Sequence, residues 1–107
     1  MREDNIEITI PGVEAIAALR EIEYVLISLH RIGSYFSTPV NEELSDEEYI
    51  KYAVETTRFI DDNNVTQRLA KARSLISSGF NDEMGDDGMG DLERDFQDIK
   101  LWERPRE

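Results

Sequence analysis

The clearest pattern in the chain is a run of apolar residues between about Val13 and Tyr35. They recur at alternating steps of four and three, which places them on one stripe of a helix. The stripe consists of Ala15, Leu19, Ile22, Leu26, Leu29, Gly33 and Phe36, with Ala18, Val25 and Ile32 on one flank. The pattern predicts a long helix that buries this stripe.

The opposite face of the same helix also carries large side chains. Tyr24, Ile27, Arg31 and Tyr35 follow one another at steps of three, four and four. A helix with large residues on both faces either lies centrally in the fold or carries an interface. These four residues therefore form a candidate surface for a second copy of the chain.

Two further helices follow, after a linker at 37–41. Ser45 and Glu48 have the spacing of a capping box and predict the start of a helix. Its expected buried stripe is Tyr49, Ala53, Thr56 and Ile60, flanked by Ile50, Tyr52 and Phe59. Asn63 or Asn64 can cap the next helix, which extends to about Ser78. Its expected stripe is Val65, Leu69, Ala72 and Ile76.

The two ends of the chain are less regular. Apolar and polar residues alternate from Asn5 to Ile10, as in an extended arm or short strand, while Leu92, Phe96 and Ile99 indicate a fourth, shorter helix. We predict an all-α fold, a small bundle of three to four helices with an extended N-terminal arm. In this prediction 1–107 is a single helical domain, with the arm at 1–11, an acidic connector at 81–91 and a tail at 104–107. The alternative is a small α+β fold in which a strand at 6–10 pairs with one at 99–103.

Composition narrows the class of protein. The 107 residues include no cysteine, which excludes disulfides and thiolate metal sites. The first residues lack the pattern of a signal peptide, and the apolar run at 22–32 is too short to cross a bilayer. We expect a cytoplasmic protein that does not enter the membrane.

Charge narrows the class of partner. The chain has 24 acidic and 12 basic residues, a formal net charge of -12. Such a field repels nucleic acid and anionic membranes and speeds encounter with a basic protein. We therefore expect no direct contact with nucleic acid.

The stretch NDEMGDDGMGD at 81–91 is the first place to look for a metal, because clustered carboxylates suit calcium or magnesium. Neither Gly85 nor Gly88 at the sixth position gives the acid spacing of an EF-hand, so only an irregular cation site stays open. His30 is the only histidine, and no acid or serine stands around it in a catalytic pattern. We expect no enzyme activity, no cofactor and no metal.

The remaining signal is a pattern of acids and aromatic residues, which together can bind a basic protein tightly. The profile is that of an inhibitor such as an immunity protein, an antitoxin or a nucleic-acid mimic, with a toxin nuclease as one basic partner. The alternative is a self-associating structural or regulatory bundle. Reversing the charge of Asp86, Asp87 and Asp91, or of Glu43 and Glu47, should slow binding to a basic partner. The candidate partner-binding residues are Asp82, Glu83, Asp86, Asp87, Asp91, Glu43, Glu47, Tyr24, Tyr35 and Trp102.

Overall fold

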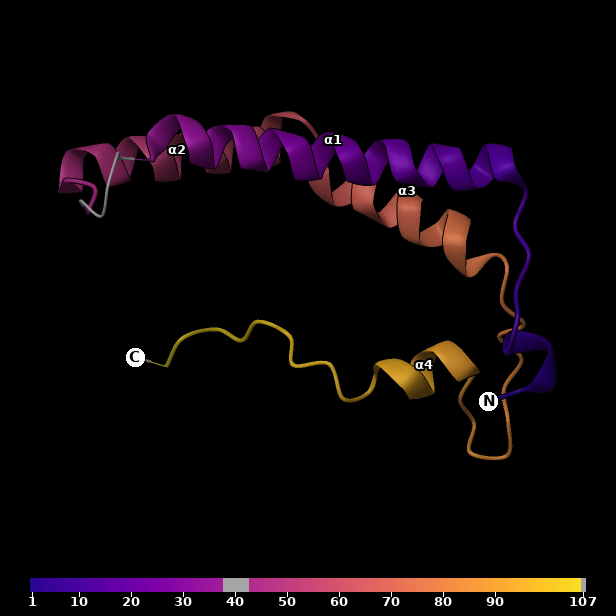
Figure 1. Ribbon diagram of the computed structural model, residues 1–107. Coiled ribbons are helices and arrows are strands. Elements are labelled where there is room, and N and C mark those ends of the chain that lie inside the picture. Colours follow the sequence, from indigo (N-terminus) through magenta and orange to yellow (C-terminus); the bar gives the residue numbers. More distant parts are fainter. Residues whose placement is uncertain (38–42, 107) are drawn as a thin grey trace. The chain divides into compact units, whose positions relative to one another are not determined.

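The computed structural model describes residues 1–37 and 43–106, and all regular structure in them is helical (Figure 1). The elements are the 3-10 helix η1 (Glu3–Asn5) and the α-helices α1 (Gly12–Phe36), α2 (Asp46–Asp62), α3 (Val65–Ser77) and α4 (Asp91–Phe96). The predicted small all-α bundle is confirmed. No strand occurs in the described residues, so the terminal strand pair of the alternative is not formed there. Most of the predicted linker, at 38–41, lies outside the described residues.

The chain divides into two compact units. One unit, here called the hairpin, spans Ile10–Ser77 and contains α1, α2 and α3. The other, here called the terminal unit, combines Met1–Thr9 with Ser78–Glu107 and contains η1 and α4. The single-domain boundaries expected from the sequence stay a prediction.

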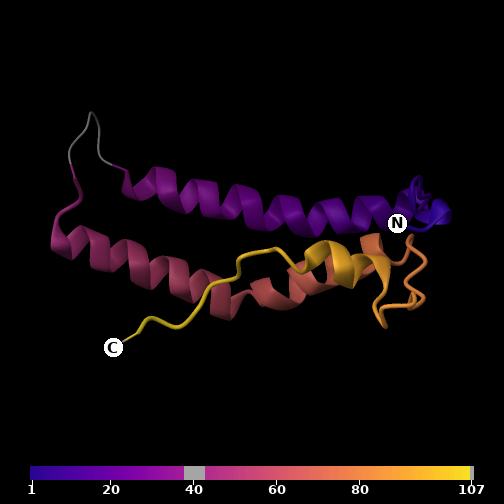
Figure 2. The same ribbon diagram turned by 90° about the horizontal axis from the view of Figure 1, so that it is seen from below.

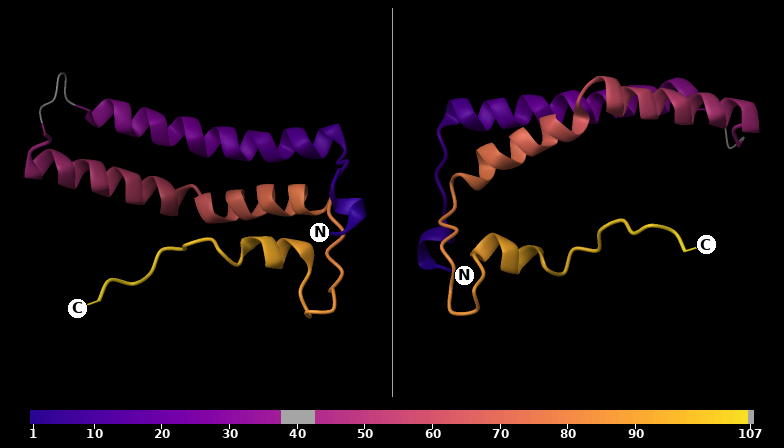
Figure 3. Two further views of the ribbon diagram at one scale, coloured as in Figure 1. Left: turned by 60° about the horizontal axis from the view of Figure 1, so that its bottom comes forward. Right: turned by 180° about the vertical axis from the view of Figure 1, so that it is seen from behind.

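The hairpin has two legs. α1 forms one leg, and α2 and α3 follow each other to form the other, running in the opposite direction (Figure 2). α1 lies beside both partners and packs most extensively against α3 (Figure 3). Each helix can thus bury only the stripe that faces the opposite leg.

The ends of the helices in the hairpin follow local side-chain chemistry. The predicted capping box starts α2, where the Ser45 side chain accepts a hydrogen bond from the Glu48 N–H at 3.2 Å. Of the two asparagines expected to cap α3, Asn63 donates its side chain to the Phe59 carbonyl at 3.1 Å and so satisfies the end of α2. Asn64 directly precedes α3, and its carbonyl accepts from the Arg68 N–H at 3.0 Å. Asn64 has a φ of 53°, in the left-handed region that asparagine tolerates better than most residues. The pair therefore ends one helix and redirects the chain.

The core of the hairpin is small: on α3 it uses Val65 and Ala72 of the predicted stripe, whereas on α1 it does not use the predicted stripe. The buried apolar residues are Ala18 and Val25 of α1 with Val65 and Ala72 of α3, and no large side chain among the described residues is fully buried. Ala18 and Val25 belong to the flank of the predicted stripe, whereas its central leucines are largely exposed. Close contact between α1 and α3 uses the small side chains, because they let the two backbones approach.

Aromatic contacts join α1 to α2. The rings of Tyr24 and Phe59 lie 5.8 Å apart, and Phe36 stacks on Tyr52 at 5.6 Å. The predicted stripe of α2 is therefore wrong by a small rotation, because Tyr52 and Phe59 face α1 while Tyr49 is 61% exposed. Tyr52 and Phe59, which flank the expected stripe, are larger than Ala53 and Thr56 within it and so reach α1.

The terminal unit is built around a turn that the sequence does not predict. Residues 3–5 form η1 instead of extending as an arm, and the Asn5 side chain is buried at 3% exposure. The fourth helix exists, but it ends at Phe96, and residues 99–103 form neither helix nor strand. Asn5 is thus the centre of this unit's polar core.

Candidate functional site

The acidic loop at 81–91 is held by Arg94 of α4. Its guanidinium donates to both carboxylate oxygens of Asp87, at 2.7 and 2.8 Å, and to the Met89 carbonyl at 3.0 Å. The Asp87 carboxylate also accepts from the Met89 N–H at 3.1 Å. Bonds to Arg94 and then to Met89 hold the pKa of Asp87 well below its usual range. This two-pronged ion pair closes the loop onto the helix that follows it.

Asp91 is the most enclosed acid of the loop, at 6% exposure. Its carboxylate accepts from the Asn5 side chain and the Arg2 N–H, both at 2.8 Å, and from Arg94 at 2.8 Å. These bonds, that from Asn5 first, lower the pKa of Asp91 from 3.8 to about 2. Asp91 therefore joins the two ends of the chain within the terminal unit.

The glycines and Asn81 complete the loop. Gly88 has a φ of +76°, which favours glycine, and a Cβ at Gly90 would collide with Asp82, whose carbonyl oxygen would lie 2.7 Å away. Asn81 and Asn5 exchange two hydrogen bonds of 2.7 Å each, between the side chain of Asn5 and the backbone of Asn81. The glycines thus serve a defined loop conformation.

The predicted partner-binding acids of the loop fall into two groups. Asp82, Asp87 and Asp91 bond within the terminal unit, and Asp82 accepts from the Leu92 N–H at 3.4 Å. Glu83 and Asp86 are exposed, and Glu83 lies 3.6 Å from the Arg2 guanidinium. In the described residues no three His, Asp or Glu side chains converge as metal ligands. The loop is mainly a structural element.

The other predicted residues are spread over the chain. Glu43 and Glu47 are exposed before and within the first turn of α2, and Glu47 lies 3.6 Å from Lys51. Tyr35 and Trp102 are each 81% exposed. Glu43, Glu47 and Tyr35 belong to the hairpin, and Trp102 belongs to the terminal unit.

Tyr24 contacts both α2 and α3 of the hairpin, although it is 37% exposed. Besides packing on Phe59, it lies under the Arg68 guanidinium, 4.2 Å from the ring centre. Its hydroxyl is 3.2 Å from the Asn63 side-chain oxygen, and Arg68 also bonds Glu21 at 3.3 Å. This cation–π contact and ion pair connect α1 to α3. The predicted self-association face of Tyr24, Ile27, Arg31 and Tyr35 is therefore divided, since Tyr24 is engaged inside the hairpin.

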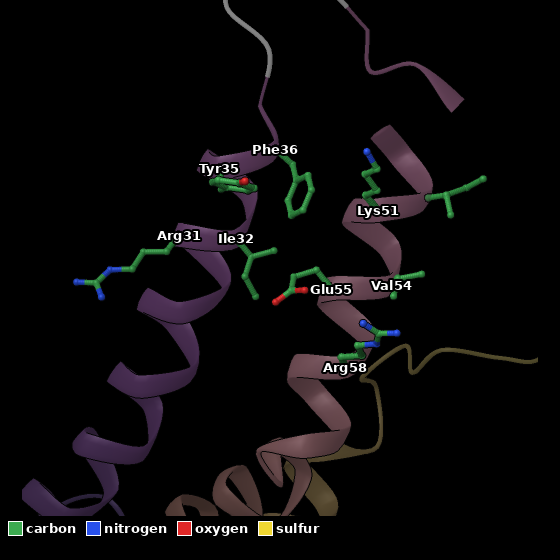
Figure 4. Close-up of a pocket in the computed structure, with 9 residues that line it drawn as sticks. Arg31, Ile32, Tyr35, Phe36, Lys51, Val54, Glu55 and Arg58 are labelled. Atoms are coloured by element: carbon green, nitrogen blue, oxygen red, sulfur yellow. The ribbon is translucent and has the colours of Figure 1, made fainter. Parts of the chain in front are cut away.

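A groove of about 690 Å³ with a mainly apolar lining lies between α1 and α2. Ile32 and Phe36 point from α1 toward α2, and Glu55 points back toward α1 (Figure 4). Ile50 and Val54 continue the apolar lining on α2 and are 61% and 41% exposed. The groove thus offers aliphatic and aromatic surface that the hairpin does not itself cover.

The charges around this groove are opposite to those of the whole chain. Its lining includes three cationic residues, Arg31, Lys51 and Arg58, and a single acid, Glu55. Within the described residues no carboxylate lies within ion-pair distance of Arg31 or Arg58. An apolar floor with a basic rim can hold an apolar segment that carries negative charge.

Sequence reasoning singled out Arg31 and Tyr35, which line this groove on α1, but missed its α2 side. Ile50, Val54 and Arg58 stand at steps of four on one face of α2, which is a visible helical repeat. The sequence predicts the stripe that begins at Tyr49 as the buried face of α2, and so does not single out the face with Ile50, Val54 and Arg58. In the structure, Tyr49 is exposed. The roles of Asn5 and Arg2 leave no comparable signal, because they depend on the two ends of the chain meeting.

Comparisons with protein-family models, with curated proteins and with solved structures found no match for this chain. Among the described residues, no helix has the length and apolar character needed to span a bilayer. His30 is exposed on α1.

Proposed function

We propose that this chain is a protein-binding module that acts by association and not by catalysis. In this proposal the groove between α1 and α2 docks an acidic amphipathic helix of a partner protein. The observation that carries it is the basic rim of the groove, with three cations to one acid in a chain that has twice as many acids as bases. Helix-in-groove binding is a common way for helical proteins to recognise partners.

The lining also supports a helical occupant. Ile32 and Phe36 lie one turn apart on α1, and Ile50 and Val54 lie one turn apart on α2. Two parallel rows of apolar side chains can receive apolar residues that recur at i, i+4 and i+7 on a third helix. Arg31 and Arg58 border the groove on its α1 and α2 sides and extend outward (Figure 4), so in this proposal they meet acids on the outer flanks of that helix.

The inhibitor class and the basic partner expected from composition stay predictions. Three of the five loop acids accept hydrogen bonds within the terminal unit, which leaves Glu83 and Asp86 outside these bonds. The groove, with its basic rim, instead favours an acidic partner segment. The two proposals differ in a way that one binding assay resolves.

The test uses two synthetic helical peptides with leucine at positions i, i+4, i+7 and i+11. One carries glutamates on its flanks and the other carries lysines at the same places. Binding is followed by fluorescence anisotropy of the labelled peptides with the full chain at physiological salt. We expect the glutamate peptide to bind and the lysine peptide to bind much more weakly; equal binding of both, or binding of neither, would contradict the proposal.

A pair of variants then locates the site. Arg31→Glu with Arg58→Glu should weaken the glutamate peptide roughly tenfold, since each rim charge contributes about 0.2–1 kcal/mol and reversal adds repulsion. Arg20→Glu with Lys71→Glu makes an equal change in charge at exposed positions of α1 and α3 outside the groove and should change affinity far less. Similar losses in all variants would indicate only long-range attraction.

A further inference from the structure

One acid faces the interior of the groove between α1 and α2. The Glu55 side chain points from α2 across the groove toward α1, whereas the rim arginines Arg31 and Arg58 extend outward (Figure 4). In the described part of the chain, no base lies within ion-pair distance of Glu55, and Lys51 instead pairs with Glu47 at 3.6 Å. The groove therefore has cations at its edges and a carboxylate without a charged partner facing its interior.

The hollow continues past Glu55 toward the turn between α2 and α3 and becomes more polar there. A second hollow, of about 420 Å³, shares Glu55 with the groove and adds the polar residues Ser28, Asp62 and Asn63. Asp62 follows Glu55 by about two helical turns, so both carboxylates lie on one face of α2. The negative charge facing the interior thus increases from Glu55 toward Asp62.

A helix that covers the groove would take water away from Glu55, which is exposed in the free chain. An ionised carboxylate that loses water without gaining a counter-charge opposes binding. An ammonium or guanidinium group of the partner would satisfy Glu55 through charge-assisted hydrogen bonds, which are stronger than those between neutral groups. The apolar stem of such a side chain can lie along Ile32 and Val54 of the lining while its charged end reaches the carboxylate.

We propose that Glu55 sets the specificity of the groove, and that the partner helix carries one lysine or arginine on its buried apolar face, opposite Glu55. This inference rests on the proposed function and adds to it the chemistry of the buried face. The partner then has acids on its flanks, near Arg31 and Arg58, and a single base among its apolar residues. Glu55 disfavours a wholly apolar face, and rejection of such competitors is a common source of specificity.

The test is a set of labelled peptides whose binding to the full chain is measured by fluorescence anisotropy. One is the glutamate peptide with leucine at i, i+4, i+7 and i+11, and each of the others carries lysine at one of these positions. We expect one central lysine, at i+4 or i+7, to raise affinity about tenfold, the lower end of the coupling between close charge pairs across interfaces. The all-leucine peptide should bind, but more weakly.

Two variants locate the effect. Glu55→Gln keeps the size of the side chain and removes its charge, so the gain from lysine should be lost. The same variant should bind the all-leucine peptide more tightly than the native chain does, because a neutral amide is easier to desolvate than a carboxylate. Asp61→Asn is the matched control, since Asp61 is an exposed acid of α2 that lines neither hollow. In this control the gain from lysine should persist.

The outcomes separate this proposal from the proposed function. If no lysine position raises affinity for the native chain, or if the gain persists in Glu55→Gln, Glu55 does not set specificity. An equal loss of the gain in Asp61→Asn would show only long-range attraction and would also overturn the proposal. In each of these cases the all-leucine glutamate peptide still binds and the proposed function stands. If no peptide of the set binds, the proposed function itself fails.

Discussion

The acidic loop of the terminal unit and helix α1 of the hairpin use their most conspicuous side chains in opposite ways. In the loop, the carboxylates of Asp87 and Asp91 accept hydrogen bonds from Arg94, Asn5 and the backbone. In α1, apolar side chains that resemble a core stay largely exposed. The loop carboxylates, which the sequence suggests as a binding surface, are hydrogen-bonded within the terminal unit. The apolar side chains of α1, which the sequence suggests as a core, are exposed and can bind a partner.

The physical reason lies in how each unit is stabilised. The terminal unit has little helix, so directional hydrogen bonds and an ion pair must define its loop. The hairpin has only two legs, and a helix in such an arrangement can cover one stripe alone. In the terminal unit, the clustered acids thus indicate hydrogen bonds that define the loop. In the hairpin, the exposed apolar residues indicate a binding surface.

The largest expected effect tests whether the small core really holds the hairpin. Ala72 is 3% exposed between α3 and α1, so Ala72→Leu has no space and should lower the free energy of unfolding by about 1–3 kcal/mol. Ala70→Leu makes the same change at an exposed position of α3 and should stay within about 0.5 kcal/mol. Urea unfolding followed by circular dichroism measures both. If the two variants unfold alike, the small-residue contact does not define the hairpin.

A second substitution tests whether the loop is structural. Asp91→Ala removes the acceptor shared by Asn5, Arg2 and Arg94 and leaves their donors without it. Backbone hydrogen exchange in 81–96 should become faster by roughly tenfold or more, while exchange in α1 stays the same. Asp86→Ala, at an exposed position of the same loop, should leave exchange unchanged. Unaltered exchange in Asp91→Ala would mean that the loop is not held by this carboxylate.

Much of the fold follows from the sequence, and much of the site does not. Helical periodicity gives the helices, and Ser45 with Glu48 gives the start of α2, because these are local effects within one turn. The choice between Leu26 and its neighbour Val25 as the buried residue depends on where α3 lies. The bond between Asn5 and Asp91 spans 86 residues and leaves no local trace. Local signals thus determine elements, while long-range contacts determine which side chains remain free.

The smallest expected effect is a dependence on pH confined to the terminal unit. Because the pKa of Asp91 falls from 3.8 in its ordinary state to about 2 in the folded chain, its ionised form is favoured by folding. Its contribution to stability is complete above about pH 4 and is lost as the pH falls from about 4 through about 2. The Arg2 amide, which donates to Asp91, should report this titration by NMR with a midpoint near 2, and Asp91→Asn should abolish it. A midpoint near 4 would show that the Asp91 carboxylate is free in water. The contrast between loop acids that are hydrogen-bonded internally and apolar residues of α1 that are exposed would then not hold for Asp91, the most buried acid of the loop.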